Sequence, residues 1–280
     1  MKKITRRSFL AAAGLTAAAL ALTACGGSSS STASSVASSA AASSEAASSS
    51  AAAAELATVE AGKLTMATNA AFPPYEMTTD AGDFEGIDIE TAQAIADKLG
   101  LELQIDDMDF DAALLSVQQG KADIVMAGVT VTDERKAVMD FSDSYATGIQ
   151  SIIVPEGSDI ASPDDLAGKK IGTQRGTTGY IYCSDDFGDE NVVAYDDGLT
   201  AVQALNNGQV DAVVIDNAPA KEFIAANPGL VILETSYAEE DYAIGLAKGS
   251  SLEDAINSAL EELKADGTLQ SIVDKYISAE

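Results

Sequence analysis

The stretch Ala113-Leu-Leu-Ser-Val-Gln-Gln-Gly120-Lys-Ala-Asp123-Ile-Val-Met126 has a counterpart in Ala201-Val-Gln-Ala-Leu-Asn-Asn-Gly208-Gln-Val-Asp211-Ala-Val-Val214. The two glycines (120 and 208) and the two aspartates (123 and 211) are both 88 residues apart. Each copy indicates an amphipathic helix, a glycine that ends it in the left-handed conformation, and a buried strand preceded by aspartate. The repeat therefore predicts two lobes of similar α/β architecture.

Strand and helix patterns alternate on both sides of each copy. Around the first copy we expect strands at 63–68, 101–105 and 122–126, with helices at 87–99 and 110–119. Around the second we expect strands at 169–173, 192–195 and 210–215, with helices at 177–184, 199–207 and 218–226. Two further helices are expected at 252–264 and 269–277. This alternation is typical of parallel βαβ units.

Composition excludes several classes of partner. The 280 residues, 46% of them hydrophobic, are enough for one large or two ordinary domains. The 44 acidic and 16 basic residues give a formal charge of -28, which repels nucleic acid and anionic lipid headgroups. There is no histidine, the side chain most often used for proton transfer at neutral pH, so an enzyme is disfavoured.

The N-terminus has the pattern of an export signal over residues 1–24. Four basic residues precede an apolar run at 9–24 that is too short to span a membrane comfortably. Thr5-Arg-Arg-Ser-Phe-Leu10 resembles the twin-arginine motif, while an ordinary general-secretion signal remains the alternative. Leu22-Thr-Ala-Cys25 resembles the bacterial lipobox, which implies that Cys25 is lipidated and begins the mature chain.

Residues 25–57 are expected to form a disordered tether. Residues 26–54 are almost entirely Ser, Ala and Gly, a composition that has little to bury. Such a chain reaches roughly 30 Å. With Cys25 acylated, Cys183 has no intramolecular partner, so we expect no disulfide and a buried, unreactive thiol on a helix.

The repeat also indicates where a ligand binds. In open α/β sheets ligands lie beyond the carboxyl ends of the strands, which here are residues 127–130 and 216–217. Gly128 would allow close backbone approach, and Thr130 offers a hydroxyl. Arg135, three residues after the expected N-cap Thr132, would suit a carboxylate clamp. The alternative is an exposed salt bridge to Glu134 or Asp140.

The second lobe complements the arginine. Gln174-Arg-Gly-Thr-Thr-Gly179 joins a strand to a helix, where backbone N–H groups favour an anion. It lacks the lysine of a phosphate-binding loop, so nucleotide is disfavoured. Asp216, at a strand end, suits an ammonium group. An arginine, an anion-binding turn and a carboxylate together describe a site for a zwitterion.

Seven stretches carry a resemblance to a known family. They are Thr68-Asn-Ala-Ala-Phe-Pro-Pro-Tyr75, Gly86-Ile-Asp-Ile89, Met108-Asp-Phe-Asp111, Ala127-Gly-Val-Thr-Val-Thr-Asp-Glu-Arg-Lys136, Phe141-Ser-Asp-Ser-Tyr145, Gln174-Arg-Gly-Thr-Thr-Gly179 and Ala265-Asp-Gly-Thr-Leu269. The chain resembles the extracellular solute-binding proteins, family 3, of polar amino-acid ABC importers. This implies the two-lobed periplasmic-binding-protein type II fold. Residues 58–148 with 241–280 would form lobe 1 and residues 149–240 lobe 2, joined by two crossing strands.

The resemblance also implies roles for individual residues. Arg135 would clamp the ligand carboxylate with help from Thr130 and Thr178, and Asp216 would take the α-ammonium. Phe72 and Phe110 would sandwich the ligand side chain, although a place in the core is the alternative for both. The full set expected to bind ligand is Asn69, Phe72, Phe110, Ala127, Gly128, Thr130, Arg135, Gln174, Thr177, Thr178 and Asp216.

Two departures from the family bear on the ligand. Relatives that bind cationic amino acids commonly carry an acid at the position of Asn69, and glutamine-binding relatives carry a lysine at that of Gln174. Both changes favour a neutral, polar ligand side chain, although Asp109 or Glu76 could still supply a charge.

The expected function is that of a substrate-binding component of an amino-acid ABC importer, anchored by lipid at the extracytoplasmic face of the membrane. Its expected partners are a free L-amino acid and a permease, with no nucleic acid. We expect a monomer without cofactor or metal. The alternatives are an enzyme on the same fold, such as a dehydratase or lyase, and a ligand-sensing receptor.

Overall fold

A computed structural model describes residues 56–234 and 236–277. The expected signal segment, Cys25 and nearly all of the expected tether lie outside these residues. Within them, no helix is both long and apolar enough to cross a membrane.

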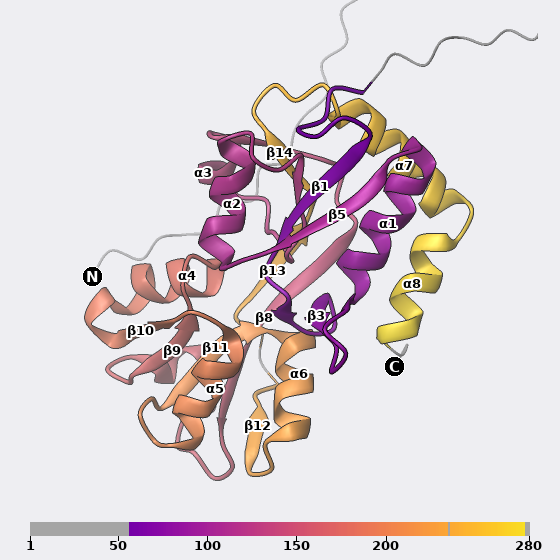
Figure 1. Ribbon diagram of the computed structural model, residues 1–280. Helices are drawn as coiled ribbons and strands as arrows, with labels where there is room; N and C mark the ends of the chain where they lie inside the picture. The colour runs from indigo at the N-terminus through magenta and orange to yellow at the C-terminus, as the bar shows by residue number, and fades with distance from the viewer. Residues whose placement is uncertain (1–55, 235, 278–280) are drawn as a thin grey trace, which may run out of the picture. The chain divides into compact units, whose positions relative to one another are not determined.

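The first sheet has the strand order β5-β1-β6-β14-β7. Its strands are β1 (Lys63–Thr68), β5 (Glu102–Asp107), β6 (Ile124–Val125), β7 (Met139–Phe141) and β14 (Gly245–Ala247). β1 is parallel to β5 and β6, and β14 is antiparallel to β6 and β7. Helices α1 (Ile87–Leu99), α7 (Glu253–Ala265) and α8 (Thr268–Tyr276) pack together on one side, and α2 (Phe110–Gln118) lies on the other (Figure 1).

The second sheet repeats this arrangement, with the order β10-β9-β11-β8-β12. Its strands are β8 (Ala146–Pro155), β9 (Ile171–Gln174), β10 (Val192–Tyr195), β11 (Ala212–Asp216) and β12 (Leu230–Ile232), and β13 (Ala238–Tyr242) pairs with β8. Its helices are α4 (Thr178–Phe187), α5 (Gly198–Asn206) and α6 (Asn217–Ala226), with 3-10 turns at Pro163–Leu166 and Asp189–Asn191. β9 is parallel to β10 and β11, and β8 is antiparallel to β11 and β12, as in the first sheet.

The repeated stretch forms the same local structure twice. Gly120 and Gly208 both end their helices at φ 66°. Asp123 accepts a hydrogen bond from Thr65 N (2.8 Å) and its own N–H donates to Thr65 O (2.9 Å). Asp211 exchanges the same pair of bonds with Lys170, each 2.8 Å long. Each aspartate therefore ties the repeat strand to the parallel strand beside it, and the prediction of two similar α/β units is confirmed.

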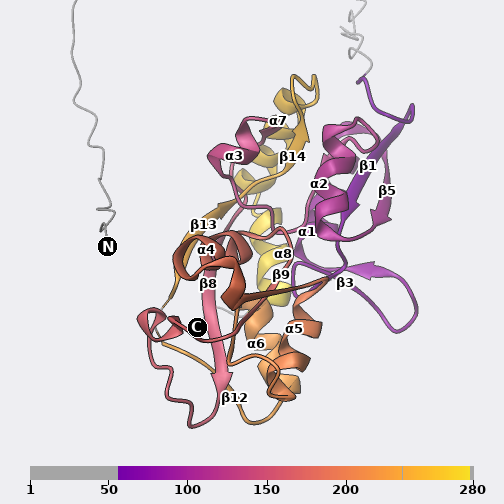
Figure 2. The ribbon, with the colours of Figure 1, turned by 90° about the vertical axis from the view of Figure 1, so that its left-hand side faces the viewer.

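The chain passes between the two sheets twice, from β7 to β8 and from β13 back to β14. β8 and β13 are antiparallel partners, with Ala146 opposite Tyr242, and Thr130 forms a bridge to Tyr242. These are the two crossing strands (Figures 1 and 2). The boundaries expected from the sequence, after residues 148 and 240, fall inside β8 and β13.

One insertion distinguishes the first lobe from the second. Between β1 and α1 the chain forms a small sheet of β2 (Ala71–Phe72), β3 (Glu76–Thr78) and β4 (Phe84–Glu85). In the second lobe only residues 175–177 separate β9 from α4. The insertion brings Phe72 and Glu76 to the region between the sheets.

Some element boundaries differ from those expected. The strand expected at 122–126 is confined to β6, because only Ile124 and Val125 pair with neighbouring strands. The helix expected at 177–184 begins one residue later and runs to Phe187, since Thr177 is its N-cap and accepts a hydrogen bond from Tyr180 N (3.3 Å). The expected buried Cys183 is confirmed: it lies on α4, fully buried, and burial raises the pKa of its thiol to about 12.

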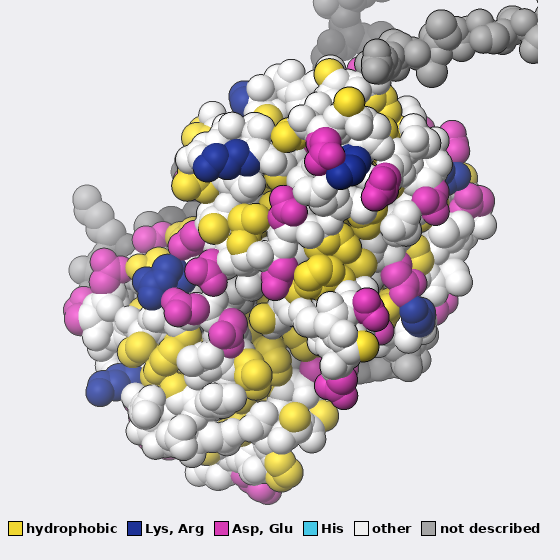
Figure 3. Space-filling model, viewed as in Figure 1, with side chains coloured by type: hydrophobic (Ala, Val, Ile, Leu, Met, Phe, Trp, Pro, Cys, Tyr) yellow, Lys and Arg dark blue, Asp and Glu magenta, His cyan; other side chains and the backbone are white. Residues whose placement is uncertain are grey.

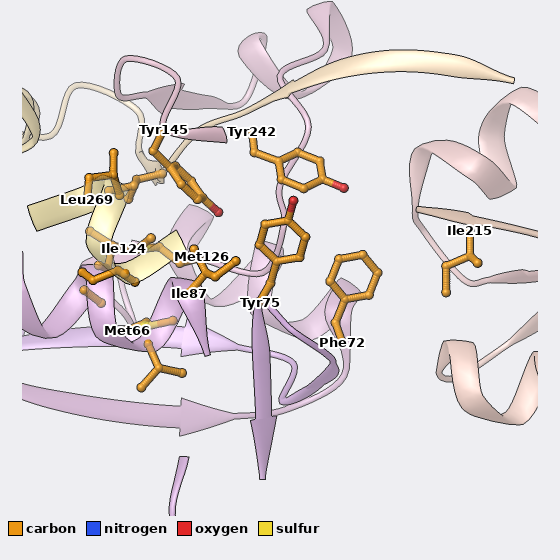
Figure 4. Close-up of a cluster of buried hydrophobic side chains, with 14 of the residues drawn as sticks. Met66, Phe72, Tyr75, Ile87, Ile124, Met126, Tyr145, Ile215, Tyr242 and Leu269 are labelled. Carbon is orange, nitrogen blue, oxygen red and sulfur yellow. The ribbon is translucent and has the colours of Figure 1, made fainter. Parts of the chain in front are cut away.

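Aromatic side chains connect the core to the crossing strands. Tyr75 stacks on Phe72, with ring centroids 5.8 Å apart, and meets the edge of Tyr242 at 5.3 Å. Figure 4 shows these three rings together, with Ile215 of β11 facing them from the other lobe. The surface in Figure 3 carries scattered acidic side chains over both lobes, in keeping with the strongly negative charge.

Candidate functional site

A cavity with about 320 Å³ of atom-free space lies between the two sheets, next to the ends of β6 and β11. Part of this volume is open solvent, so it is larger than the enclosed space. Its lining includes all the residues expected to bind ligand: Asn69, Phe72, Phe110, Ala127, Gly128, Thr130, Arg135, Gln174, Thr177, Thr178 and Asp216. Glu76 completes the lining. Residues from distant parts of the sequence thus converge on one cavity.

Arg135 is held inside the cleft. The residue is only 8% exposed, on the short helix α3 (Asp133–Lys136) whose N-cap Thr132 accepts from Arg135 N (3.2 Å). Its Nη1 donates to Thr130 O (2.8 Å), and its Nη2 donates to Gly176 O of the opposite lobe (3.1 Å). Burial lowers the pKa of Arg135, but guanidinium remains charged at neutral pH. The alternative of an exposed salt bridge is therefore wrong.

Two aromatic rings form walls of the cavity. The Arg135 guanidinium lies over the Phe110 ring, 5.4 Å from its centroid, which adds a cation–π contact. Phe110 is the first residue of α2, and Phe72 belongs to the inserted sheet. Both are more than nine-tenths buried and both line the cavity, so burial and a place in the lining coexist.

Asp216 is a buried carboxylate at the end of β11, 7% exposed. Its Oδ2 accepts a hydrogen bond from Gln150 Nε2 (2.7 Å), whereas its Oδ1 has no partner of good geometry among the described residues. Burial raises the pKa of Asp216 to about 7, and the nearby Tyr242 and Gln150 side chains offset only part of this rise. Such a carboxylate is suited to a ligand that brings its own positive charge.

Asn69 and Gln174 join the two lobes directly. Gln174 Nε2 donates to Asn69 Oδ1 (2.9 Å), and Asn69 Nδ2 donates to Met108 O (2.9 Å). Thr177 lies beside them and donates from Oγ1 to Gln174 O (2.8 Å). The two residues that depart from the family pattern are therefore joined by one hydrogen bond across the cleft.

The hydroxyls of Thr130 and Thr178 both donate a hydrogen bond to Glu240. Glu240 was not among the site residues predicted from the sequence. Glu240 Oε2 accepts from Thr130 Oγ1 (3.1 Å), Thr178 Oγ1 (2.9 Å) and Gln150 Nε2 (3.0 Å). Glu240 is 7% exposed and lies on the crossing strand β13. Its position two residues before the buried Tyr242 was the available signal, because alternate residues of a strand face the same side.

Glu76, named from the sequence only as a possible source of charge, lines the cavity. It is fully buried, and neither carboxyl oxygen has a hydrogen-bond partner of good geometry among the described residues. Burial and the neighbouring Asp88 carboxyl raise the pKa of Glu76 well above its usual range. Burial likewise raises the pKa of Asp88 to about 6, although Asp88 accepts from Gly128 N (3.0 Å). The residues of the chain described above contain no cluster of three His, Cys, Asp or Glu that could hold a metal ion.

Comparison with known proteins agrees with this geometry. The chain is 33% identical over 226 residues to the L-cystine-binding protein TcyJ of Escherichia coli K12, covering 79% of this chain and 85% of TcyJ. The arginine-, lysine-, histidine-binding protein ArtJ of Geobacillus stearothermophilus is 34% identical, with a TM-score of 0.75 over 78% of this chain and 96% of ArtJ. An ancestral arginine-binding protein, solved bound to glutamine, is 42% identical, with a TM-score of 0.75 over 79% of this chain and all of the other.

Residues 64–279 match the family described as bacterial extracellular solute-binding proteins, family 3. The match covers most of the chain, and the relatives share both its sequence and its two-lobed α/β fold. The chain belongs to the bacterial extracellular solute-binding proteins, family 3.

Proposed function

We propose that this protein binds a free L-amino acid in the inter-lobe cavity and delivers it to the permease of an ABC importer. The observation that carries the proposal is the pairing of a buried guanidinium, Arg135, with a buried carboxylate, Asp216, in one small cavity. A zwitterion presents the two opposite charges that such a pair needs. The family provides the transport setting, because its members bind amino acids and work with ABC permeases.

The carboxylate of the ligand would bind at Arg135. The guanidinium is desolvated and already donates to two carbonyl oxygens, which fixes its plane. A guanidinium has five N–H donors, so others remain for a carboxylate. An anion in this place would also gain from the low dielectric of the closed cleft.

The ammonium of the ligand would bind at Asp216. Its Oδ1 is buried beside the Tyr242 hydroxyl and can accept a further hydrogen bond, and an ammonium placed there would lower the pKa of Asp216 and hold the carboxylate ionised. The backbone at Ala127 and Gly128 lines the same cavity. This assignment leaves the ligand side chain between Phe72 and Phe110.

The end of the side chain would meet Glu76. The sequence favoured a neutral, polar side chain, and that prediction stays open. A basic side chain would give the buried Glu76 carboxyl, which lies beside Asp88, a counter-charge, whereas an amide would donate hydrogen bonds to it. We therefore propose a side chain that ends in N–H donors, arginine-like or glutamine-like; one relative is an arginine-binding protein solved with glutamine.

A calorimetric screen of the twenty amino acids, cystine and ornithine tests the function. We expect a single ligand or a small group with N–H-rich side chains to bind, and titrations in two buffers separate the two kinds. At about pH 8.5, where Asp216 is already ionised, a basic ligand should release a proton from Glu76, because the pKa of Glu76 is raised well above its usual range, whereas an amide should not. No heat from any of these compounds, at concentrations up to millimolar, would contradict the proposal.

We also propose that the protein is a receptor rather than an enzyme, acting as a monomer. Relatives that are substrate-binding transport proteins support the assignment as a receptor. The best ligand, incubated for a day with stoichiometric protein, should be recovered unchanged by mass spectrometry. A new product that depends on the protein would favour the dehydratase or lyase alternative.

Anchoring by Cys25 is a separate proposal. It rests on the lipobox-like Leu22-Thr-Ala-Cys25, and it would place the protein at the extracytoplasmic face of the membrane. Cys25→Ser should release the protein from the membrane fraction, while Cys183→Ser, the matched control, should leave it there. Equal membrane association of Cys25→Ser and the unaltered protein would refute the anchor.

A further inference from the structure

The hydroxyls of Thr130 and Thr178 are already engaged inside the protein. Each hydroxyl carries one proton and can donate one hydrogen bond. Both donate to Glu240 Oε2, at 3.1 and 2.9 Å, and the two hydroxyl oxygens are themselves 3.5 Å apart. Glu240 Oε2 is the acceptor in both bonds, so neither hydroxyl has its proton left for a ligand.

The third donor to Glu240 fixes the carboxyl group in this place. Gln150 Nε2 has two protons and donates one hydrogen bond to Glu240 Oε2 (3.0 Å) and the other to Asp216 Oδ2 (2.7 Å). Glu240 is also close enough to Arg135 to favour the charged guanidinium. The Glu240 carboxylate accepts hydrogen bonds from both threonine hydroxyls and attracts Arg135. These are the interactions expected of the ligand's own carboxylate.

We propose that Glu240 is a positioning residue that withholds the hydroxyl protons of Thr130 and Thr178 from the ligand carboxylate. The inference rests on the proposed amino-acid site and adds an internal competitor to it. The ligand must either displace the Glu240 carboxylate or bind without the two hydroxyl donors, and it is repelled by a like charge in both cases. The affinity of the site is therefore lower than its own donors would permit.

The contacts also connect Glu240 to closure of the cleft. Thr130 follows β6 in the first sheet, Thr178 begins α4 in the second lobe, and Glu240 is on the strand that crosses between them. One carboxylate thus accepts a hydrogen bond from a side chain of each lobe. The same bonds that compete with the ligand therefore favour closure of the cleft.

The test is calorimetric titration of Glu240→Gln with L-arginine and L-glutamine. The amide keeps the size, loses the charge and can donate to one threonine, which frees a hydroxyl proton for the ligand. We expect the probe that binds the unaltered protein to bind Glu240→Gln at least about tenfold more tightly. Glu239→Gln is the matched control, because it removes the same charge from an exposed position on the same strand, and its affinity should stay within threefold.

Thr178→Val gives a second readout that a merely structural role would not move. In the unaltered protein the Thr178 hydroxyl donates to Glu240 and not to the ligand. Thr178→Val should therefore lower affinity less in the unaltered protein than in the Glu240→Gln background. Equal costs in the two backgrounds, with an affinity of Glu240→Gln no better than that of Glu239→Gln, would overturn the inference.

Folding and ligand identity are separated in the same experiment. If Glu240→Gln does not fold by circular dichroism, Glu240→Asp replaces it, because the shorter side chain withdraws from Thr178 and should also tighten binding. Should the unaltered protein and Glu239→Gln bind neither L-arginine, L-glutamine nor any other amino acid, the proposed function fails and the inference fails with it. If both bind and neither Glu240 variant gains affinity, the inference alone fails.

Discussion

The two lobes share one frame but carry different residues where that frame meets the ligand cavity. Gly120 and Asp123 have counterparts 88 residues later in Gly208 and Asp211. Both glycines end a helix, and both aspartates accept a hydrogen bond from the backbone of the neighbouring chain segment. The same offset, applied at the strand end, pairs Gly128 with Asp216. The helix–glycine–strand structure is thus repeated in both lobes, whereas the residue type at the end of the repeat strand differs.

The room available for a Cβ atom explains why glycine occupies a different one of these positions in each lobe. A Cβ on Gly128, whose φ is 54°, would lie 2.8 Å from the Phe72 ring, so only glycine leaves room for that aromatic wall. The start of the helix differs in the same way, because Phe110 in the first lobe corresponds to Gly198 in the second. A Cβ on Gly198 would lie 2.4 Å from Ile215 Cδ1, so there the position belongs to the core. One lobe contributes an aromatic wall and backbone, and the other contributes a carboxylate.

The largest effect is expected from Arg135→Ala, which removes the cation on the first lobe's side of the site. The ligand carboxylate would remain buried and unpaired, at a cost of about 2–5 kcal/mol, or roughly thirty- to several-thousand-fold in affinity. Arg135→Lys should recover only part of this loss, because an ammonium lacks the planar two-donor fork. Calorimetry measures both, with the exposed Arg175→Ala as the control; similar affinities for Arg135→Ala and Arg175→Ala would break the assignment.

Asp216→Asn should separate binding from stability. It removes the charge facing the ammonium, so affinity should fall by a factor comparable to that of Arg135→Ala. The ligand-free protein should melt a few degrees higher, because a buried carboxylate without a counter-charge is costly. Asp211→Asn changes the matching structural aspartate of the repeat and lies outside the cavity. It weakens the hydrogen bond from Lys170 N, so the protein should lose about 1 kcal/mol of stability while its affinity for the ligand stays unchanged. Both effects are read from calorimetry and thermal melts.

Gly128→Ala sharpens the comparison with a smaller change. The added Cβ would displace Phe72 from the cavity wall, and we expect about tenfold weaker binding. Gly120→Ala strains the backbone at a similar φ of 66° but meets no atom within 4 Å. Backbone strain should cost each variant about 1–2 kcal/mol of stability, and Gly128→Ala should lose more because of the clash with Phe72. Only Gly128→Ala should lose affinity. Equal affinity losses would mean that backbone strain, not the wall, is responsible.

The smallest effect is that of pH. Asp216 must be ionised to face an ammonium, and its pKa in the ligand-free protein is about 7. Affinity should therefore rise between pH 6 and 8 and fall by up to about tenfold for each pH unit below 7. Stability of the ligand-free protein should change in the opposite sense: because the pKa of Asp216 is higher folded than unfolded, its contribution is lost as pH rises through 7. Titrations and melts at pH 6, 7 and 8 check both, and the difference between the unaltered protein and Asp216→Asn isolates the contribution of Asp216 from those of Glu76 and Asp88.

The elements that the sequence predicted best are those with local signals. Lys63–Thr68, Ile87–Leu99 and Val192–Tyr195 have the bounds expected, because apolar periodicity and a terminating glycine or polar turn define them within a few residues. β13 was not expected from its own pattern. Ala-Glu-Glu-Asp-Tyr looks like an exposed acidic segment, and it becomes a strand through its pairing with β8.

The site could be predicted as a list of residues but not as a network. The lining followed from the family stretches, because those positions end strands or begin helices. That Asn69 bonds to Gln174 across the cleft, or that Glu240 takes both threonine hydroxyls, depends on how the two lobes meet. Glu76 is similar: its burial arises from the inserted sheet, and a glutamate after Pro-Pro-Tyr carries no local sign of it.

The central claim is that the cavity binds both ends of a zwitterion, one at Arg135 and the other at Asp216. It is tested most directly by titrating the protein with its best-binding amino acid and two analogues, one without the α-carboxylate and one without the α-ammonium. For arginine the first analogue is agmatine. We expect each analogue to bind at least a hundredfold more weakly than the amino acid. Binding of either analogue within tenfold of the amino acid would contradict the two-ended site.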